Sequence, residues 1–151
     1  MNNNLTILIT GCAGFIGAAL TKKFLSLNYK VVGIDNINDY YDQNLKFSRL
    51  NEIHTYAKEK KCLWKFFEVS ICDKYEISKV FLDNKPNIVV NLAAQAGVRF
   101  SIKNPEAYLE SNLNGFFNIL ENCRVNNVNH LVYASSIVHL GLPIEADLQT
   151  L

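Results

Sequence analysis

Five short apolar runs alternate with longer amphipathic stretches along most of the chain. The runs are rich in β-branched and aromatic residues and predict strands at residues 5–10, 29–35, 63–69, 87–92 and 130–135. The stretches between them predict helices at residues 14–28, 44–60, 73–84 and 105–126. Strands that alternate with helices favour a parallel sheet with helices on both faces. Right-handed crossovers make the doubly wound strand order 3-2-1-4-5 the preferred topology of this α/β fold.

The helix predicted at residues 44–60 carries apolar residues on one side. Leu45, Leu50, Ile53 and Ala57 are expected to face the sheet. Asp73 precedes the next helix, and we expect its carboxylate to cap that helix.

The composition fits one globular domain and excludes several classes of function. The 151 residues are 49% hydrophobic and 19% charged, which allows a sizeable core. The net charge is +1 without a block of like charges, so we expect neither nucleic-acid nor membrane-surface binding. No apolar run approaches the roughly 20 residues that span a bilayer, and residues 1–4 lack the basic segment of a signal peptide, so a cytoplasmic location is expected. The four cysteines form no C-x-x-C pair and accompany no histidine cluster, so no metal site is expected.

A glycine triplet joins the first predicted strand to the first predicted helix. Its spacing is G-x-x-G-x-x-G, from Gly11 through Gly14 to Gly17. Gly11 would allow a tight turn, Gly14 a close approach of the backbone to a pyrophosphate, and Gly17 close packing of the helix. Unpaired N–H groups and the dipole of a helix N-terminus favour phosphate. The triplet therefore predicts a phosphate-binding loop, although an ordinary glycine turn is the alternative.

Asp35 ends the second predicted strand at the place where a ribose ligand is expected. It follows the glycine loop by about 20 residues, which is the spacing of the dinucleotide fingerprint. Its carboxylate can accept hydrogen bonds from an adenosine ribose and would repel a 2′-phosphate. The two features together predict a site for NAD rather than NADP.

Several segments resemble the extended short-chain dehydrogenase/reductase family of NAD-dependent epimerases and dehydratases. They are residues 10–17, 32–36 and 91–99. Residues 35–42, 95–101, 104–105 and 111–113 resemble more closely the UDP-glucuronate 4-epimerase group. The likeness covers roughly residues 5–136. It implies a Rossmann-like NAD-binding domain of an enzyme that removes hydride from C4 of a nucleotide sugar and returns it.

The resemblance also implies the residues of the site. The implied cofactor-binding residues are Gly11, Gly14, Phe15, Ile16, Gly17, Asp35, Asn36, Ser70, Ile71, Leu92, Ala93, Ala94 and Asn112. Arg99 would face an anionic group of the substrate, with a solvated surface charge as the alternative. Asn112 would otherwise be an exposed helix residue. Ser136 is implied as the catalytic serine that hydrogen-bonds the sugar hydroxyl that is oxidised.

The sequence departs from the family pattern in two places. Ser70 stands where family members usually carry an aspartate that meets the adenine amino group, and Asp73 is not its replacement. A neutral hydroxyl accepts hydrogen bonds more weakly than a carboxylate, so we expect weaker NAD affinity. The likeness fades after Ser136, and residues 137–151 contain no Tyr-x-x-x-Lys, the catalytic pair of the family.

We therefore expect residues 1–151 to form an incomplete Rossmann domain that does not turn over alone. The C-terminal substrate domain would be absent, and residues 137–151 would be a divergent tail, for which a shortened or frame-shifted product is our hypothesis. The favoured function is the NAD-binding part of a 4-epimerase of the UDP-glucuronate/UDP-galacturonate type. A non-catalytic NAD-binding remnant or interaction module is the alternative. A 4,6-dehydratase is disfavoured because Ser136-Ile137-Val138 does not supply its Thr-Asp-Glu.

The partners implied by the resemblance are a nucleotide-sugar substrate and a second copy of the chain. The second copy would pack against the long helix predicted at residues 105–126.

Overall fold

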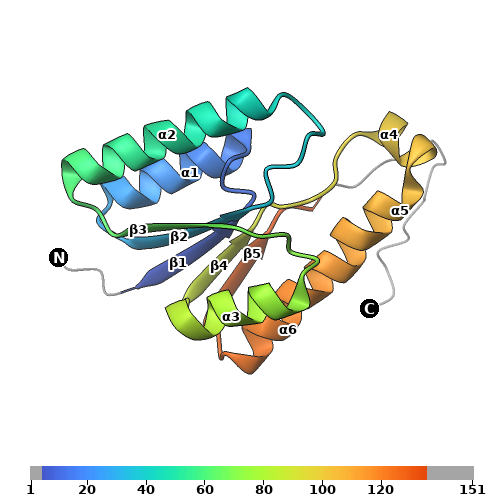
Figure 1. The fold of residues 1–151 in the computed structure, drawn as a ribbon. Helices are drawn as coiled ribbons and strands as arrows, with labels where there is room; N and C mark the ends of the chain where they lie inside the picture. The colour runs from blue at the N-terminus through green and yellow to red at the C-terminus, as the bar shows by residue number, and fades with distance from the viewer. Residues whose placement is uncertain (1–4, 136–151) are drawn as a thin grey trace, which may run out of the picture.

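The computed structural model describes residues 5–135, which form a five-stranded parallel sheet between two layers of helices (Figure 1). The strands are β1 (Thr6–Thr10), β2 (Lys30–Asp35), β3 (Trp64–Glu68), β4 (Ile88–Asn91) and β5 (His130–Tyr133). Their order is β3-β2-β1-β4-β5, and each neighbouring pair is parallel. The doubly wound fold and the strand order expected from the sequence are confirmed.

Both faces of the sheet are covered, which explains the nearly continuous apolar runs of its central strands. The helices α1 (Phe15–Ser26) and α2 (Gln43–Lys60) lie on one face, and α3 (Lys74–Asn84) and α6 (Phe116–Val125) lie on the other (Figure 1). Side chains alternate between the faces along a strand. Ile7 and Ile9 of β1 accordingly pack in the core under α1 and α2, whereas Leu8 packs in the core under α3 and α6.

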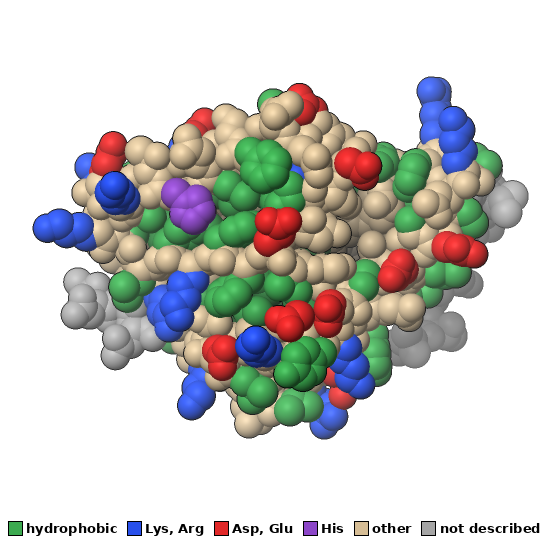
Figure 2. Space-filling model, in the orientation of Figure 1, with side chains coloured by type: hydrophobic (Ala, Val, Ile, Leu, Met, Phe, Trp, Pro, Cys, Tyr) green, Lys and Arg blue, Asp and Glu red, His purple; other side chains and the backbone are tan. Residues whose placement is uncertain are grey.

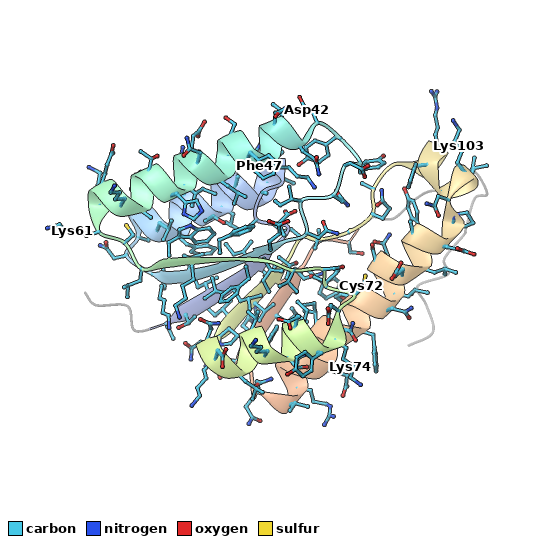
Figure 3. The ribbon with its side chains drawn as sticks, in the orientation of Figure 1. Asp42, Phe47, Lys61, Cys72, Lys74 and Lys103 are labelled. Atoms are coloured by element: carbon cyan, nitrogen blue, oxygen red, sulfur yellow. The ribbon has the colours of Figure 1, made fainter. Side chains whose placement is uncertain are left out.

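The cap expected for one helix is present, and a second helix carries a cap that was not predicted. Asp73 accepts a hydrogen bond from the Glu76 N–H at 3.0 Å, as predicted for the start of α3. Asp42 caps α2 in the same way through the Asn44 N–H at 2.9 Å. Figure 3 labels Asp42 and Lys61 at the two ends of α2, where Lys61 adopts the left-handed conformation that ends the helix.

The buried side of α2 differs from the expectation at its first position. Leu45 is 50% exposed, and Lys46 lies on the buried side together with Leu50, Ile53 and Ala57. The helix is therefore rotated so that a charged side chain, rather than a leucine, packs nearest the end of β2.

The helix predicted at residues 105–126 is helical over nearly that range, but it is not a uniform α-helix. It consists of α5 (Pro105–Tyr108), a π-helical segment η1 (Leu109–Gly115) and α6. A further short helix, α4 (Val98–Lys103), precedes it and was not predicted. Both α4 and α5 lie beyond the carboxyl ends of the strands (Figure 1). The widened turn thus occurs where the long helix passes the loops of the sheet, and such turns are frequent at functional sites.

The surface carries charges of both signs. Figure 2 shows basic and acidic side chains interspersed over the visible face. None of the helices in residues 5–135 is long and apolar enough to cross a membrane. Within the same residues, no three His, Cys, Asp or Glu side chains gather in a group that could hold a metal ion.

Candidate functional site

The carboxyl ends of β1 and β4 mark the point where the chain departs to opposite sides of the sheet. Thr10 and Asn91 are the last residues of these strands, and the Thr10 hydroxyl donates to Asn91 Oδ1 at 2.6 Å. The same hydroxyl accepts hydrogen bonds from the N–H groups of Leu92 at 3.2 Å and Ala93 at 3.1 Å. Ligands of doubly wound sheets bind at such a switch point. A cleft of about 340 Å³ opens at this edge between the glycine loop, the end of β2 and the loops after β3 and β4. We call it the first cleft.

The glycine loop has the close contacts expected of it. Gly11 has φ +68°, and a Cβ there would lie 2.9 Å from the Ala93 nitrogen. A Cβ on Gly17 would lie 2.1 Å from the Gly11 carbonyl oxygen, so α1 packs directly on the loop. Gly14 is the N-cap of α1 and supplies no capping side chain, and the first turn carries no acidic residue. The first N–H groups of α1, including those of Phe15 and Ile16, are therefore suited to an anion.

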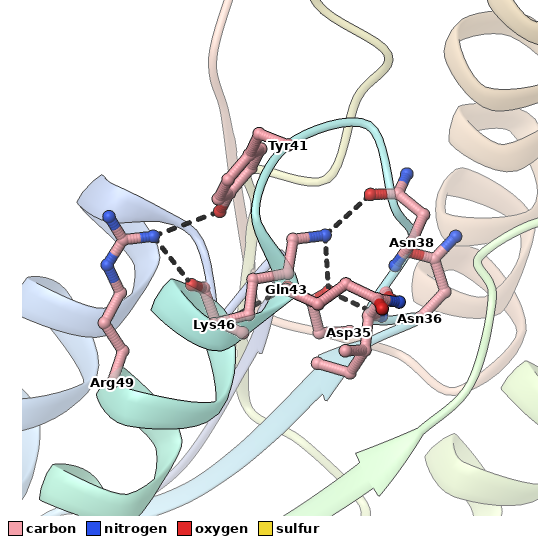
Figure 4. Close-up of polar contacts among 9 residues, drawn as sticks. Asp35, Asn36, Asn38, Tyr41, Gln43, Lys46 and Arg49 are labelled. Atoms are coloured by element: carbon pink, nitrogen blue, oxygen red, sulfur yellow. Dashed lines mark hydrogen bonds and ion pairs between the residues drawn. The ribbon is translucent and has the colours of Figure 1, made fainter.

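Asp35 lies beside the glycine loop and is 7% exposed. Its Oδ2 accepts a hydrogen bond from the Ala13 N–H at 3.0 Å, and its Oδ1 accepts one from the Ile37 N–H at 3.0 Å (Figure 4). Asp35 and Asn36 both line the first cleft. The carboxylate predicted to meet a ribose is therefore fixed at the carboxyl edge of the sheet.

Two cations of α2 lie at this end of the cleft and were not anticipated as site residues. Lys46 Nζ is 3.7 Å from Asp35 Oδ1 and donates to Asn38 Oδ1 at 2.6 Å (Figure 4). Arg49 Nη1 donates to the Ala13 carbonyl oxygen at 3.2 Å and to the Tyr41 hydroxyl at 3.1 Å.

The position of Arg49 is also supported by aromatic rings. Its guanidinium carbon lies 5.9 Å from the ring centre of Phe15 and 5.8 Å from that of Tyr41. Arg49 thus connects α2 to the glycine loop. For Lys46, the sequence contained one signal that could have predicted its position. Lys46 precedes Leu50 by four residues and therefore lies on the same side of the helix as Leu50.

The loop after β3 forms another wall of the first cleft. Ser70 and Ile71 line it, and the Ser70 hydroxyl accepts a hydrogen bond from the Cys72 N–H at 3.2 Å. Asn118 of α6 donates to the carbonyl oxygens of Ile71 at 3.0 Å and Cys72 at 3.2 Å. This loop is thereby held against α6, while Asp73 is engaged as the cap of α3.

A second cleft, of about 830 Å³, lies on the other side of residues 92–96 and extends toward Tyr108, Phe116 and Ser135. Leu92, Ala93 and Ala94 line both clefts, so a ligand could continue from one into the other.

The remaining predicted site residues are not placed against the first cleft. Asn112 lines the second cleft, and its amide binds the backbone of Gln95, so its contact with a cofactor stays a prediction. Arg99 is exposed on α4 and is not among the described residues that line either cleft, so its role toward a substrate also stays a prediction. Ser136 lies outside the described residues.

Two thiols near the sheet are buried. Burial raises the pKa of Cys12 well above its usual value, and the neighbouring Asp35 charge raises it further. Burial raises the pKa of Cys123 to about 11. Neither is suited to act as a nucleophile near neutral pH, because the thiolate is the reactive form.

Comparison with known proteins gives one consistent family. The sequence model of the NAD dependent epimerase/dehydratase family matches residues 7–148. Protein CapI of Staphylococcus aureus is 51% identical over 132 residues, which cover 87% of this chain and 38% of CapI. A UDP-glucuronate 4-epimerase of Thermodesulfobacterium geofontis is 39% identical over 145 residues, which cover 94% of this chain and 43% of that enzyme.

A solved structure agrees with these relatives. The UDP-glucose 4-epimerase of Thermus thermophilus, in complex with NAD, has a TM-score of 0.70 and 32% identity over 87% of this chain and 38% of that one. The chain therefore spans about two fifths of the length of the relatives that it matches.

Proposed function

Because the chain belongs to the NAD dependent epimerase/dehydratase family, we propose that it binds NAD and is the NAD-binding part of a nucleotide-sugar 4-epimerase. The observation that carries this proposal is the placement of Asp35. Its buried carboxylate is held by the N–H of Ala13 in the glycine loop and faces the first cleft. A helix end suited to phosphate and a carboxylate suited to ribose therefore lie close together at one cleft.

The residues of the first cleft fit a dinucleotide part by part. The N–H groups at the start of α1 would hold the pyrophosphate. Asp35 and Asn36 would hold the adenosine ribose, and Ser70 with Ile71 would lie against the adenine. The nicotinamide half would extend into the second cleft past Leu92, Ala93 and Ala94, since these residues line both clefts. Bound NAD supplies the hydride acceptor of the reaction.

We place the sugar of the substrate in the second cleft and propose a UDP-uronate as its class. The support is the name of the T. geofontis relative and the group-specific likeness of residues 35–42 and 95–101. Ser135 lines this cleft. On the family resemblance, Ser136 is our proposed partner of the reacting sugar hydroxyl.

We propose that the 151 residues bind NAD without turning over a substrate. The Tyr-x-x-x-Lys pair that would exchange the proton of the sugar hydroxyl is not found in residues 137–151. Loss of a general base typically slows a reaction by about 10²–10⁴-fold.

A second copy of the chain is our proposed protein partner. Leu109, Leu113, Phe117 and Leu120 are all exposed and follow one another at helical spacings, so they form an apolar stripe along the long helix. We call this the helix stripe.

A cytoplasmic location is proposed on the basis of the four free cysteines, which suit a reducing compartment.

Calorimetric titration of the purified chain with NAD tests the cofactor. We expect one NAD per chain and a rise in melting temperature. Trp64 starts β3 and pairs with Val31, whereas the Asp35–Glu68 pair at the cleft lies four residues further along the strands. Because Trp64 is therefore not at the cleft, calorimetry is preferable to tryptophan fluorescence. The variant Asp35→Asn should weaken binding at unchanged fold. A folded chain that gives neither heat nor thermal stabilisation with NAD would contradict the proposal, and epimerisation of UDP-glucuronate by the chain alone would contradict its predicted inactivity.

A further inference from the structure

Lys46 is a buried lysine on a helix face that otherwise carries apolar residues. Its side chain is 5% exposed, and it shares this face of α2 with Leu50, Ile53 and Ala57. An ammonium group is costly to bury, and replacement of a buried ion pair by apolar residues of similar volume is often neutral or stabilising. The presence of this ammonium group beside the first cleft therefore indicates that it has a role in polar interactions.

The carboxylate of Asp35 does not need Lys46 for its hydrogen bonds. Each of its oxygens already accepts one backbone N–H, from Ala13 and from Ile37. The separation of 3.7 Å between Lys46 Nζ and Asp35 Oδ1 is an ion pair but exceeds hydrogen-bond length. Neutralising the charge is thus only part of what the ammonium can do.

Both groups retain hydrogen-bonding capacity toward the cleft that they line. An ammonium has three protons, and Lys46 donates one to Asn38. A carboxylate oxygen can accept two hydrogen bonds, so each oxygen of Asp35 can take one more. A donor and an acceptor therefore lie side by side at the place where the proposed ribose would bind.

We propose that Lys46 is a specificity-determining residue that, together with Asp35, binds the vicinal hydroxyls of an unsubstituted ribose. Asp35 accepts from one hydroxyl, and Lys46 donates to the oxygen of a hydroxyl. This inference rests on the proposed NAD binding and adds to it a second recognition element, contributed by α2. The ligand class is a nucleotide with a free 2′,3′-diol.

The surroundings argue against a 2′-phosphate as the ligand of Lys46. Asp35 lies 3.7 Å from the ammonium and is held in place by two N–H groups, so its negative charge stays beside any incoming phosphate. The other cation nearby, Arg49, is engaged by the Ala13 carbonyl oxygen and by Tyr41. The pair of Lys46 and Asp35 has no net charge and therefore suits a neutral diol.

The test is calorimetric titration of the 151-residue chain and its Lys46→Met variant with NAD, 2′-deoxy-NAD, 3′-deoxy-NAD and NADP. For the wild type we expect at least one deoxy analogue to bind about tenfold more weakly than NAD, and NADP to bind more weakly still. Lys46→Met should bind NAD about tenfold more weakly and should lose the preference for one hydroxyl. Lys58→Met, an exposed lysine on the same helix, should keep the wild-type pattern.

Two results would overturn the inference while leaving NAD binding intact. One is an equal loss for NAD and both deoxy analogues in Lys46→Met, which is what a purely structural ion pair gives. The other is NADP binding to the wild type as tightly as NAD. If Lys46→Met does not fold by circular dichroism, Lys46→Gln takes its place in the same titrations with NAD and both deoxy analogues. A folded wild type that binds none of the ligands rejects the proposed function together with this inference.

Discussion

Asn112 holds the backbone of Gln95 through two hydrogen bonds, with its Oδ1 accepting the N–H at 2.8 Å and its Nδ2 donating to the carbonyl oxygen at 3.0 Å. Gln95 lies in the loop after β4 and lines both clefts. Asn112 lies in the π-helical segment η1, and the widened turn occurs where this amide reaches the loop. One side chain therefore fixes the wall that separates the two clefts.

Replacing Asn112 by leucine should destabilise the chain and weaken NAD binding. The change leaves two backbone groups of a partly buried loop without their partner, and an unsatisfied group of this kind costs about 1–3 kcal/mol. We expect the free energy of unfolding in urea to fall by about 2 kcal/mol. Asn114→Leu is the matched control, since Asn114 is exposed in the same π-helical segment. Equal stability of the two variants would show that the Asn112 amide does not hold the loop.

Gly14 and Gly17 of the glycine loop should differ in their tolerance of a methyl group. A Cβ on Gly17 would lie 2.1 Å from the Gly11 carbonyl oxygen, whereas one on Gly14 would lie 3.0 Å from the same atom. The first contact requires the backbone of α1 to move, and the second needs only a small shift. We expect Gly17→Ala to lower the free energy of unfolding by about 3 kcal/mol and Gly14→Ala by about 1 kcal/mol. Urea unfolding of both variants measures the order, and the reverse order would contradict the described packing.

The sequence predicted the strands and helices of the sheet well because the two signals used, apolar runs and the turn and cap residues between them, are local. Apolar runs such as residues 5–10 and residues 87–92 correspond to strands that are buried on both faces, and the turn and cap residues between them mark where helices begin. Asp73 is one such cap. The order of the strands then follows from the handedness of the crossovers.

The site was predicted less completely because its missing parts depend on contacts between distant residues. Lys46 reads as a solvated charge until the fold places Asp35 and Asn38 beside it. The partner of Asn112 in the π-helical segment is likewise distant, since Gln95 lies 17 residues away in the sequence. Helical periodicity predicts the helix but contains no information on where one of its turns will be widened or which loop its side chains will contact.

Arg49→Met should weaken NAD binding more than it weakens the fold. The guanidinium connects α2 to the Ala13 carbonyl oxygen of the glycine loop, so its loss frees the loop without opening the core. One hydrogen bond of this kind is worth about 1 kcal/mol, or roughly a fivefold change in affinity. Calorimetry with NAD and urea unfolding measure the two effects separately. Arg124→Met, which removes only an exposed pair with Glu121, serves as the control and should change neither quantity appreciably.

The buried thiol of Cys123 should lower stability at alkaline pH. Burial raises its pKa from the usual 9.0 to about 11. Below pH 9 the thiol is neutral in the folded and the unfolded chain, so its full contribution to the free energy of unfolding is present there. Above pH 9 the unfolded chain ionises first, and stability is lost until about pH 11, by at most about 1.4 kcal/mol per pH unit.

The variant Cys123→Val isolates this contribution from other alkaline titrations. Urea unfolding between about pH 8 and pH 11 should show a less steep loss of stability for the variant than for the wild type. Parallel curves for the two proteins would mean that the Cys123 thiol ionises equally easily in both states.

The helix stripe should mediate self-association of the chain. Phe117 is 58% exposed near the middle of the stripe, and a glutamate there would place an unpaired charge in an apolar contact between two copies. We expect the wild type to form dimers at micromolar concentration in sedimentation experiments and Phe117→Glu to shift the dissociation constant by at least about tenfold. Phe47→Glu is the control, because Phe47 is 52% exposed on α2, on the opposite face of the sheet (Figure 3). A wild type that stays monomeric, or a Phe47→Glu variant that dissociates as readily as Phe117→Glu, would contradict the assignment of this surface, since the stripe would then have no role that an equally exposed aromatic elsewhere lacks.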